Sequence, residues 1–190
     1  MFQLSVLAVL MAALGMTCAR SSGEGGEPKP ASPVAPADAS SPKNAVQLLQ
    51  DYTRLVSPEN IDEVFDLFSE DALLEFPFFK SIGIPARLAG REAIRKQIAP
   101  FVKNETENFR FHDIKIWASA EPDRAFGEYS VTAKIKSTGR VYNQTYVARC
   151  ETKNGKIVHL IEYANPINGA IAIFPGGLRD LTTKKMKVIF

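Results

Sequence analysis

Apolar residues recur at helical spacing in three segments of the first half of the expected folded region. The first stripe predicts a helix that buries Tyr52, and it consists of Val46, Leu49, Tyr52 and Val56. Ser41 and Pro42 lie before this stripe and match an N-cap followed by a first-turn proline. Similar stripes predict a second, short helix over residues 61–68 and a third helix over residues 91–102.

From residue 109 onward the pattern becomes typical of strands. Segments rich in β-branched and aromatic residues cover 109–119, 124–136, 140–152 and 156–164. Turn residues separate these segments, and Asn154-Gly155 is a strong hairpin signal. A shorter strand is predicted over residues 72–76, between the second and third helices. Helices that precede a meander of strands predict an α+β domain, with the helices packed on one face of a curved antiparallel sheet.

One carboxylate interrupts an apolar row on the last predicted strand. Side chains alternate across a strand, so Glu162 is expected to share its face with Val158, Leu160 and Ala164. An acid on an apolar face has to be paired, hydrogen-bonded or protonated. Two interpretations remain open. Glu162 either faces a cavity, where desolvation would fit it for general acid or base chemistry, or forms a structural ion pair with Arg149 or another basic side chain of the sheet.

The N-terminal residues predict export from the cytoplasm. An apolar run over residues 4–16 has the length of the hydrophobic region of a signal peptide and is short for a membrane span. We expect residues 1–19 to form the signal peptide. Lipidation of Cys18 is the alternative route, which would attach the protein to a membrane. Residues 20–43 are rich in Pro, Ala, Ser and Gly, which predicts a disordered tether to a domain over residues 44–178. The expected location is therefore extracytoplasmic, either secreted, periplasmic or lipid-anchored.

Charge and composition exclude several classes of partner. The sequence of 190 residues has a net charge of +2 at pH 7, and the basic tail over residues 179–190 is too small to attract nucleic acid. His112, His159 and Cys150 lack the spacing of a metal site, and no glycine-rich phosphate loop is present. The sequence therefore predicts no nucleic-acid partner, no metal and no organic cofactor.

Four segments, "DYTRLV", "FSEDALLEFPF", "AGREAIRK" and "NGKIVHLIEYANPI", follow one another in an order that resembles the ketosteroid-isomerase-like, or nuclear transport factor 2-like, superfamily. The SnoaL-like and PhzA/PhzB-type branch is the most similar. The resemblance implies a cone-shaped curved antiparallel sheet with three N-terminal helices packed on its concave face. It also implies an apolar cavity that binds a small hydrophobic ligand, and dimerisation through the sheet. Bulky side chains such as Phe76, Phe101 and Trp117 leave open a filled, inert cone.

The resemblance also assigns roles to individual residues. Tyr52 matches the tyrosine of ketosteroid isomerases, but Phe76 falls on their catalytic base and Val147 on their second acid. Steroid isomerisation by that mechanism is therefore disfavoured, because proton abstraction needs a base within reach. Glu162 matches a glutamate proposed as acid/base in PhzA/PhzB-type proteins, whereas Gln97 replaces a histidine of that branch.

The predicted catalytic residues are accordingly Glu162 as acid/base and Tyr52 as the group that polarises a substrate carbonyl. The predicted ligand-binding residues are Phe76, Gln97, Trp117, Tyr146 and Val147. Two functions of different class follow. One is a cofactor-free isomerase, cyclase or condensing enzyme that acts on a small hydrophobic carbonyl or aromatic compound. The other is a non-catalytic module that binds such a compound or only dimerises.

Overall fold

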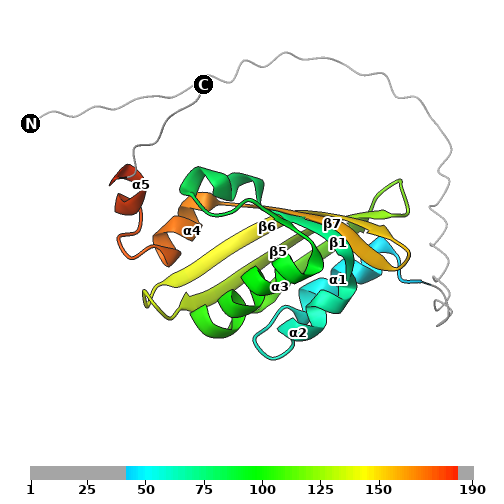
Figure 1. Cartoon of the computed structure of the whole chain (residues 1–190), viewed down its shortest axis with the longest axis horizontal. Helices are drawn as coiled ribbons and strands as arrows, with labels where there is room; N and C mark the ends of the chain where they lie inside the picture. Colours follow the sequence, from blue (N-terminus) through cyan, green and yellow to red (C-terminus); the bar gives the residue numbers. More distant parts are fainter. Residues whose placement is uncertain (1–41, 184–190) are drawn as a thin grey trace, which may run out of the picture. The chain divides into compact units, whose positions relative to one another are not determined.

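The structure is a computed structural model, and it describes residues 42–183 (Figure 1). The predicted signal peptide, Cys18, nearly all of the predicted tether and the end of the basic tail lie outside the described residues. Among the described residues, no helix is long and apolar enough to cross a bilayer. The described part forms the predicted α+β domain. The predicted helices and strands occur in the predicted order, and further short elements and the helix after the last strand are additional.

The helical elements begin with α1, Ala45–Leu55. Its N-cap is Asn44, whose side chain accepts from the Gln47 backbone while Gln47 bonds back to Asn44, so the helix starts later than the Ser41-Pro42 signal predicts. The other helical elements are α2 Ile61–Val64, η1 Phe65–Leu67, η2 Pro77–Ile82, α3 Arg91–Pro100, the π-helical turn η3 Phe101–Glu105, α4 Pro166–Ile173 and α5 Arg179–Thr183.

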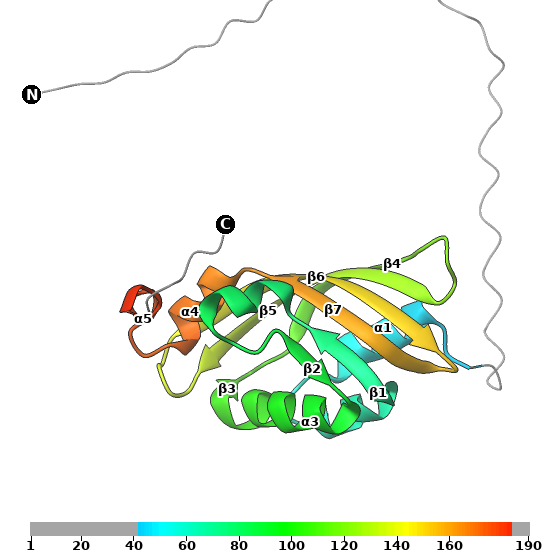
Figure 2. The ribbon, with the colours of Figure 1, turned by 45° about the horizontal axis from the view of Figure 1, so that its top comes forward.

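Seven strands form one sheet in the order β2-β1-β7-β6-β5-β3, with β4 also paired to β5 (Figure 2). Their bounds are β1 Phe68–Glu75, β2 Arg87–Ala89, β3 Thr106–Glu107, β4 Phe111–Ala118, β5 Arg124–Ile135, β6 Val141–Lys153 and β7 Lys156–Ala164. The pairs are antiparallel except for β1 and β7, which run parallel. The four long predicted strands are confirmed within a few residues at their ends.

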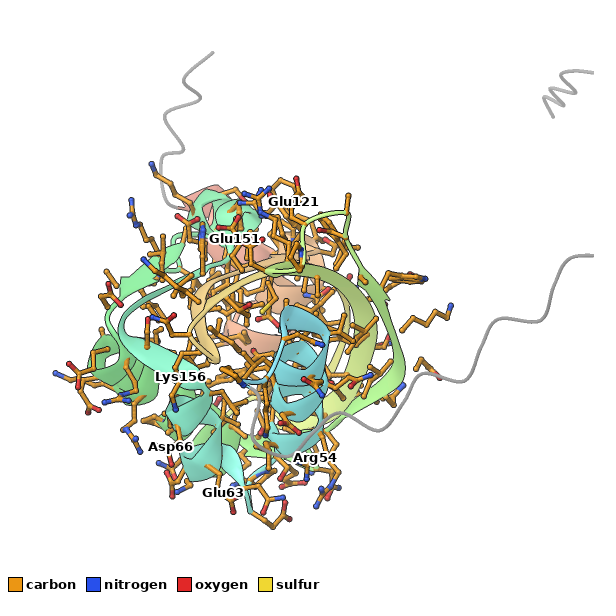
Figure 3. The ribbon with its side chains drawn as sticks, turned by 90° about the vertical axis from the view of Figure 1, so that its right-hand side faces the viewer. Arg54, Glu63, Asp66, Glu121, Glu151 and Lys156 are labelled. Atoms are coloured by element: carbon orange, nitrogen blue, oxygen red, sulfur yellow. The ribbon has the colours of Figure 1, made fainter. Side chains whose placement is uncertain are left out.

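The sheet curls around α1, as the end-on view in Figure 3 shows. Side chains on β5 and β6 alternate strictly between buried and more exposed positions, so each strand turns one row of residues toward the helices. Gly127 lies where α1 crosses β5. A Cβ atom there would come within 3.0 Å of Leu49 Cδ2, so the missing side chain lets the helix approach the sheet closely.

A helix after the last strand closes one end of the curled sheet (Figure 1). This helix, α4, begins at Pro166, with the Asn165 side chain as its N-cap. The buried Gln144 side chain bonds to both the N–H and the carbonyl of Asn165 and so fixes the helix to β6. At the other end of α4, the Arg140 guanidinium donates to the carbonyls of Ile171, Phe174 and Pro175.

Candidate functional site

A cavity of about 310 Å³ lies between the concave face of the sheet and the helical elements. Its wall is mostly apolar and includes residues of α1, α3, β6, β7 and the end of α4. Aromatic side chains contribute much of the wall, namely Tyr52, Phe76, Phe79, Phe101, Phe109, Phe111, Tyr142, Tyr146 and Phe174. Such a cavity suits a small, mainly hydrophobic compound. The sequence-based alternative of a completely filled cone is therefore wrong.

Glu162 lies on the inner face of β7 and lines this cavity. The residue is only 2% exposed and is flanked by the buried inward residues Leu160 and Ala164. Val158 does not share this buried row as predicted, because the pairing of β6 with β7 shifts between Glu151 and Thr152 and buries Ile157 instead. The first interpretation of the sequence, in which Glu162 faces a cavity, matches this geometry.

Two tyrosine hydroxyls hold one oxygen of the Glu162 carboxyl group. Tyr52 on α1 donates to Oε1 at 3.2 Å, and Tyr129 on β5 donates to the same oxygen in a shorter contact. Neither bond reaches Oε2. Among the described residues, the side-chain nitrogen and oxygen atoms that are fully enclosed and lack a hydrogen-bond partner are the Nε atoms of Arg124 and Arg149. Oε2 of Glu162 has no described hydrogen bond and is not one of these atoms, so it is not fully enclosed. We conclude that Oε2 is the oxygen that a molecule in the cavity would meet.

The ionisation of Glu162 is strongly perturbed by its surroundings. Burial raises the pKa of its carboxyl group to about 7, although the hydrogen bonds from Tyr129 and Tyr52 act in the opposite direction. Burial and the neighbouring Glu162 charge raise the pKa values of Tyr52 and Tyr129 well above the usual range, so both hydroxyls keep their protons. Glu162 therefore exchanges a proton near neutral pH, which is what general acid–base chemistry requires.

A second polar group on the cavity wall is a pair of tyrosine hydroxyls on β6. The hydroxyl oxygens of Tyr142 and Tyr146 lie 2.7 Å apart, and both residues are buried. Ring contacts from Phe109 and Phe101 hold Tyr142, and Phe111 packs edge-on against Tyr146. Burial raises the pKa of Tyr142 to about 12 and raises the pKa of Tyr146 well above its usual range, so both hydroxyls stay neutral at physiological pH.

Several residues predicted from the sequence meet at this cavity. Tyr52, Phe76, Gln97, Tyr146 and Glu162 all line it. Phe76 stacks on Phe79, whereas Gln97 is exposed on α3 and therefore lies at the rim. Their roles in ligand binding or catalysis stay predictions. The role predicted for Tyr52 does not fit the hydrogen bonding, because its one hydroxyl proton is donated to Glu162.

Two of the predicted ligand-binding residues do not reach the cavity. Trp117 on β4 is 50% exposed and Val147 on β6 is 52% exposed, and both lie away from the cavity wall. Strand alternation explains the correction for Val147: its neighbours Tyr146 and Ala148 point inward, so Val147 points to the convex face. Trp117 lies beside Phe126 on β5, which is also exposed.

The structural ion pair that the sequence left open is absent from the described residues. Arg149 lies on the convex face and pairs with Glu151 at 3.3 Å, while Glu162 is bonded to tyrosines on the concave face. Tyr129 and Tyr142 were not among the residues predicted from the sequence. Strand alternation could have identified Tyr129. The polar residues Glu128, Ser130 and Thr132 share one face of β5, so Tyr129 lies on the opposite face, which is buried.

The described residues contain no group of three His, Cys, Asp or Glu side chains placed to hold a metal ion. His112 contacts Asp113 and Thr132, and His159 contacts Glu75 on the sheet. Cys150 is fully buried, and burial raises the pKa of its thiol to about 12. The expectation that the protein needs no metal or cofactor stays a prediction.

The curled sheet and the helices that cover its concave face define a small α+β domain built around an apolar cavity. Residues 49–160 match the SnoaL-like domain family, and this segment is more than half of the chain. The chain belongs to this family. The predicted superfamily is therefore confirmed. Glu162 lies just beyond the matched segment, so membership alone gives it no role.

Individual relatives agree with this assignment. An uncharacterized PhzA/B-like protein of Pseudomonas aeruginosa is 30% identical over 124 residues, which are 65% of this chain and 86% of that protein. The structure of a Bacillus subtilis protein proposed to be an isomerase is 26% identical, with a TM-score of 0.62 over 69% of this chain and 93% of that chain. A phenazine biosynthesis-related protein of P. aeruginosa is 18% identical, with a TM-score of 0.59 over 73% and 84% of the two chains, and shows the shared fold.

The raised pKa of Glu162 predicts how stability depends on pH. The protonated acid is favoured in the folded protein, so the stabilisation is complete below the ordinary value of 4.5 and is lost as pH rises to about 7. This loss amounts to about 3 kcal/mol. Glu162→Gln keeps an oxygen that accepts from both tyrosines and does not titrate. We expect the variant to have nearly the same free energy of unfolding as the wild type at about pH 5 and a higher one at about pH 8.

Thermal and urea unfolding of both proteins across this range measures the effect. Glu128→Gln on the convex side of β5 is the matched control, and it should leave the pH dependence unchanged. A large loss of stability in Glu162→Gln near about pH 8 would instead show that Glu162 is held as a structural anion.

Proposed function

We propose that the domain binds a small, mainly apolar carbonyl compound in its cavity and that Glu162 transfers a proton to or from a carbon atom of that compound. The observation that carries this proposal is the carboxyl group of Glu162, which is buried, lines the cavity, and has its Oε2 atom unbonded by the tyrosines that hold Oε1. The name of the Bacillus subtilis relative, a proposed isomerase, supports the same class of chemistry.

The proposed step moves one proton and one electron pair. Ionised Oε2 takes a proton from the carbon next to the carbonyl, and the C–H electron pair moves toward the carbonyl oxygen to give an enolate. The electron pair then returns from the enolate oxygen to carbon, which takes a proton from Glu162. Hydrogen exchange results when the carboxyl proton has first been replaced from water and is delivered to the same carbon, and isomerisation results when a conjugated enolate is protonated at its far carbon. Tyr52 and Tyr129 keep the carboxyl group in place throughout, because they bond to Oε1.

The apolar cavity wall favours this step in two ways. It excludes water from the carboxyl group, which brings the pKa of Glu162 to about 7 and gives the carboxylate the basicity needed at neutral pH. It also holds a flat hydrophobic compound against the acid by contact with aromatic rings such as Phe76 and Phe111.

A ligand-binding role without catalysis is the second candidate function. Glu162 is the single carboxyl group among the described cavity residues, so the cavity wall holds no second acid to share the proton transfer.

Exchange of carbon-bound hydrogen tests the proposal without knowledge of the natural substrate. 2-Tetralone is a flat bicyclic ketone with acidic hydrogens next to its carbonyl, and it suits a cavity of about 310 Å³. In D₂O the wild-type protein should speed deuterium incorporation into 2-tetralone above the buffer rate. The protein-catalysed rate should rise with pH through about 7, since the carboxylate is the active form.

Glu162→Gln should lower the protein-catalysed rate at least about 100-fold, because a positioned general base contributes on that order. Glu128→Gln should keep the wild-type rate. Binding of 2-tetralone, measured by calorimetry, separates the two candidate functions. If the wild-type protein binds the ketone but does not speed exchange at saturation, the catalytic role fails and the binding role remains.

We propose further that the domain acts outside the cytoplasm, on the sequence evidence of the apolar leader and of the Pro/Ala/Ser/Gly-rich segment after it. Purified from its source cell, the protein should lack residues 1–17 or 1–19. Intact-mass analysis distinguishes the two processing routes, because lipidation adds acyl mass to Cys18. A chain that still begins at Met1 in the cytosol would contradict this proposal.

Pairing of two copies through the convex face of the sheet is a separate proposal. Trp117 pairs across strands with Phe126, and Val147 with Tyr163, and all four side chains are between 37% and 52% exposed. A dimer would cover these apolar side chains. Analytical ultracentrifugation should find a dimer that Val147→Glu dissociates, whereas Val141→Glu near the far end of the same strand should not. A wild-type monomer at high concentration would contradict it.

A further inference from the structure

The tyrosine hydroxyls around the cavity differ in whether a proton remains for a ligand. A phenolic hydroxyl carries one proton and can donate one hydrogen bond. Tyr52 and Tyr129 each donate that proton to Oε1 of Glu162. Their donor capacity is therefore used within the protein, and neither can bind the oxygen of a ligand while these bonds persist.

The Tyr142–Tyr146 pair has a different proton count. The two hydroxyls carry two protons and make one hydrogen bond to each other, with either residue as the donor. One proton is used in that bond. In both arrangements the accepting hydroxyl keeps its own proton. The Gln144 side chain also bonds to Tyr142, but this bond lowers the pKa of Tyr142, so the amide is the donor and the tyrosine proton is not used. The pair thus offers one neutral donor on the cavity wall.

The position of the pair relative to Glu162 suits a ligand that spans both. Glu162 on β7 faces Ala148 on β6, and Tyr146 is two residues from Ala148 on the same inner row. Tyr146 is therefore a diagonal neighbour of Glu162, at a typical separation of about 7–8 Å between Cα atoms. Tyr142 lies four residues from Tyr146 on that row, further from the acid. A carbonyl oxygen and its neighbouring carbon fit between such groups.

We propose that the Tyr142–Tyr146 hydroxyl pair is the subsite that binds the carbonyl oxygen of the ligand. This inference rests on the proposed function and adds the group that orients the compound and stabilises charge on its oxygen. The accepting hydroxyl donates its remaining proton to the carbonyl oxygen, and the hydrogen bond within the pair strengthens that donor. When a proton leaves the carbon, the same bond holds the enolate oxygen. The subsite thus selects neutral compounds with a hydrogen-bond-accepting oxygen.

Binding of two matched probes measures the subsite. 2-Tetralone carries the ketone oxygen, and 2-methylidenetetralin replaces that oxygen by a CH₂ group with nearly the same shape. Both are measured at about pH 8.5, where Glu162 is mostly ionised and can only accept hydrogen bonds, while Tyr52, Tyr129, Tyr142 and Tyr146 stay protonated. The ratio of the two dissociation constants then measures the hydrogen bond donated to the ketone oxygen. The affinity for the hydrocarbon alone measures the apolar contacts with the cavity wall.

The double variant Tyr142→Phe/Tyr146→Phe removes both hydroxyls and keeps both rings. Loss of both partners of a buried hydrogen bond costs little stability, so this variant should fold. We expect the affinity ratio of ketone to hydrocarbon to fall about tenfold in the double variant, with unchanged affinity for the hydrocarbon. Gln97→Leu removes the competing neutral side-chain donor at the cavity rim. Glu128→Gln, on the convex side of β5, is the control that should keep the wild-type ratio.

Each other outcome contradicts the inference in a distinguishable way. If the ratio falls in Gln97→Leu and not in the double variant, the rim amide binds the oxygen. If neither variant changes the ratio while the hydrocarbon still binds, the tyrosine subsite fails and the proposed ligand cavity stands. If neither probe binds the wild-type protein, both proposals fail. An infrared spectrum of bound 2-tetralone in the wild-type protein should show a lowered carbonyl stretching frequency, and an unshifted band would overturn the inference without any variant.

Discussion

The burial of one carboxyl group in an apolar cavity is the constraint on which the rest of this site depends. Removing a carboxylate from water is costly, and two tyrosine hydroxyls on Oε1 of Glu162 only partly offset that cost. The result is an acid whose pKa lies near 7 instead of near 4.5. No basic side chain lines the described cavity wall, so no ion pair from that wall lowers the raised pKa of Glu162. The fold maintains a group that is unfavourable for stability and suitable for proton transfer.

The elements of the fold each contribute to this environment. Helix α1 brings Tyr52 against the sheet, and the absence of a side chain at Gly127 allows that close packing. Strand β5 supplies Tyr129, and β6 supplies the Tyr142–Tyr146 pair beside it. Helix α4, which follows the last strand, closes one end of the sheet. Ile173 and Phe174 join the cavity wall there, and Arg140 bonds to the backbone of that end. Long-range packing thus assembles a site from segments that are distant in sequence.

Much of the fold could be predicted from the sequence because its strands alternate clearly between apolar and polar residues. The position of Tyr52 on a buried helix face and of Glu162 on an inward row followed from the same periodicity. The contacts of Glu162 could not be predicted. The choice between Arg149 and the two tyrosines depends on which face of the curled sheet each strand presents, and the bulge in β7 changes that alternation locally.

Trp117 was misplaced because size and hydrophobicity alone do not identify a face. The helix α4 was missed because its residues, "PINGAIAI", lack the polar face of an amphipathic helix.

Glu162 is thus an uncharged or readily protonated acid at neutral pH, enclosed by apolar residues and tyrosine hydroxyls. Its titration can be followed by ¹³C NMR of the side-chain carboxyl carbons of glutamate, with the Glu162 signal assigned by its absence in Glu162→Gln. The raised pKa of Glu162 predicts a titration midpoint of about 7 for that signal. A midpoint at or below the ordinary glutamate value of 4.5 would contradict it, because Glu162 would then be a stabilised anion over the whole physiological range.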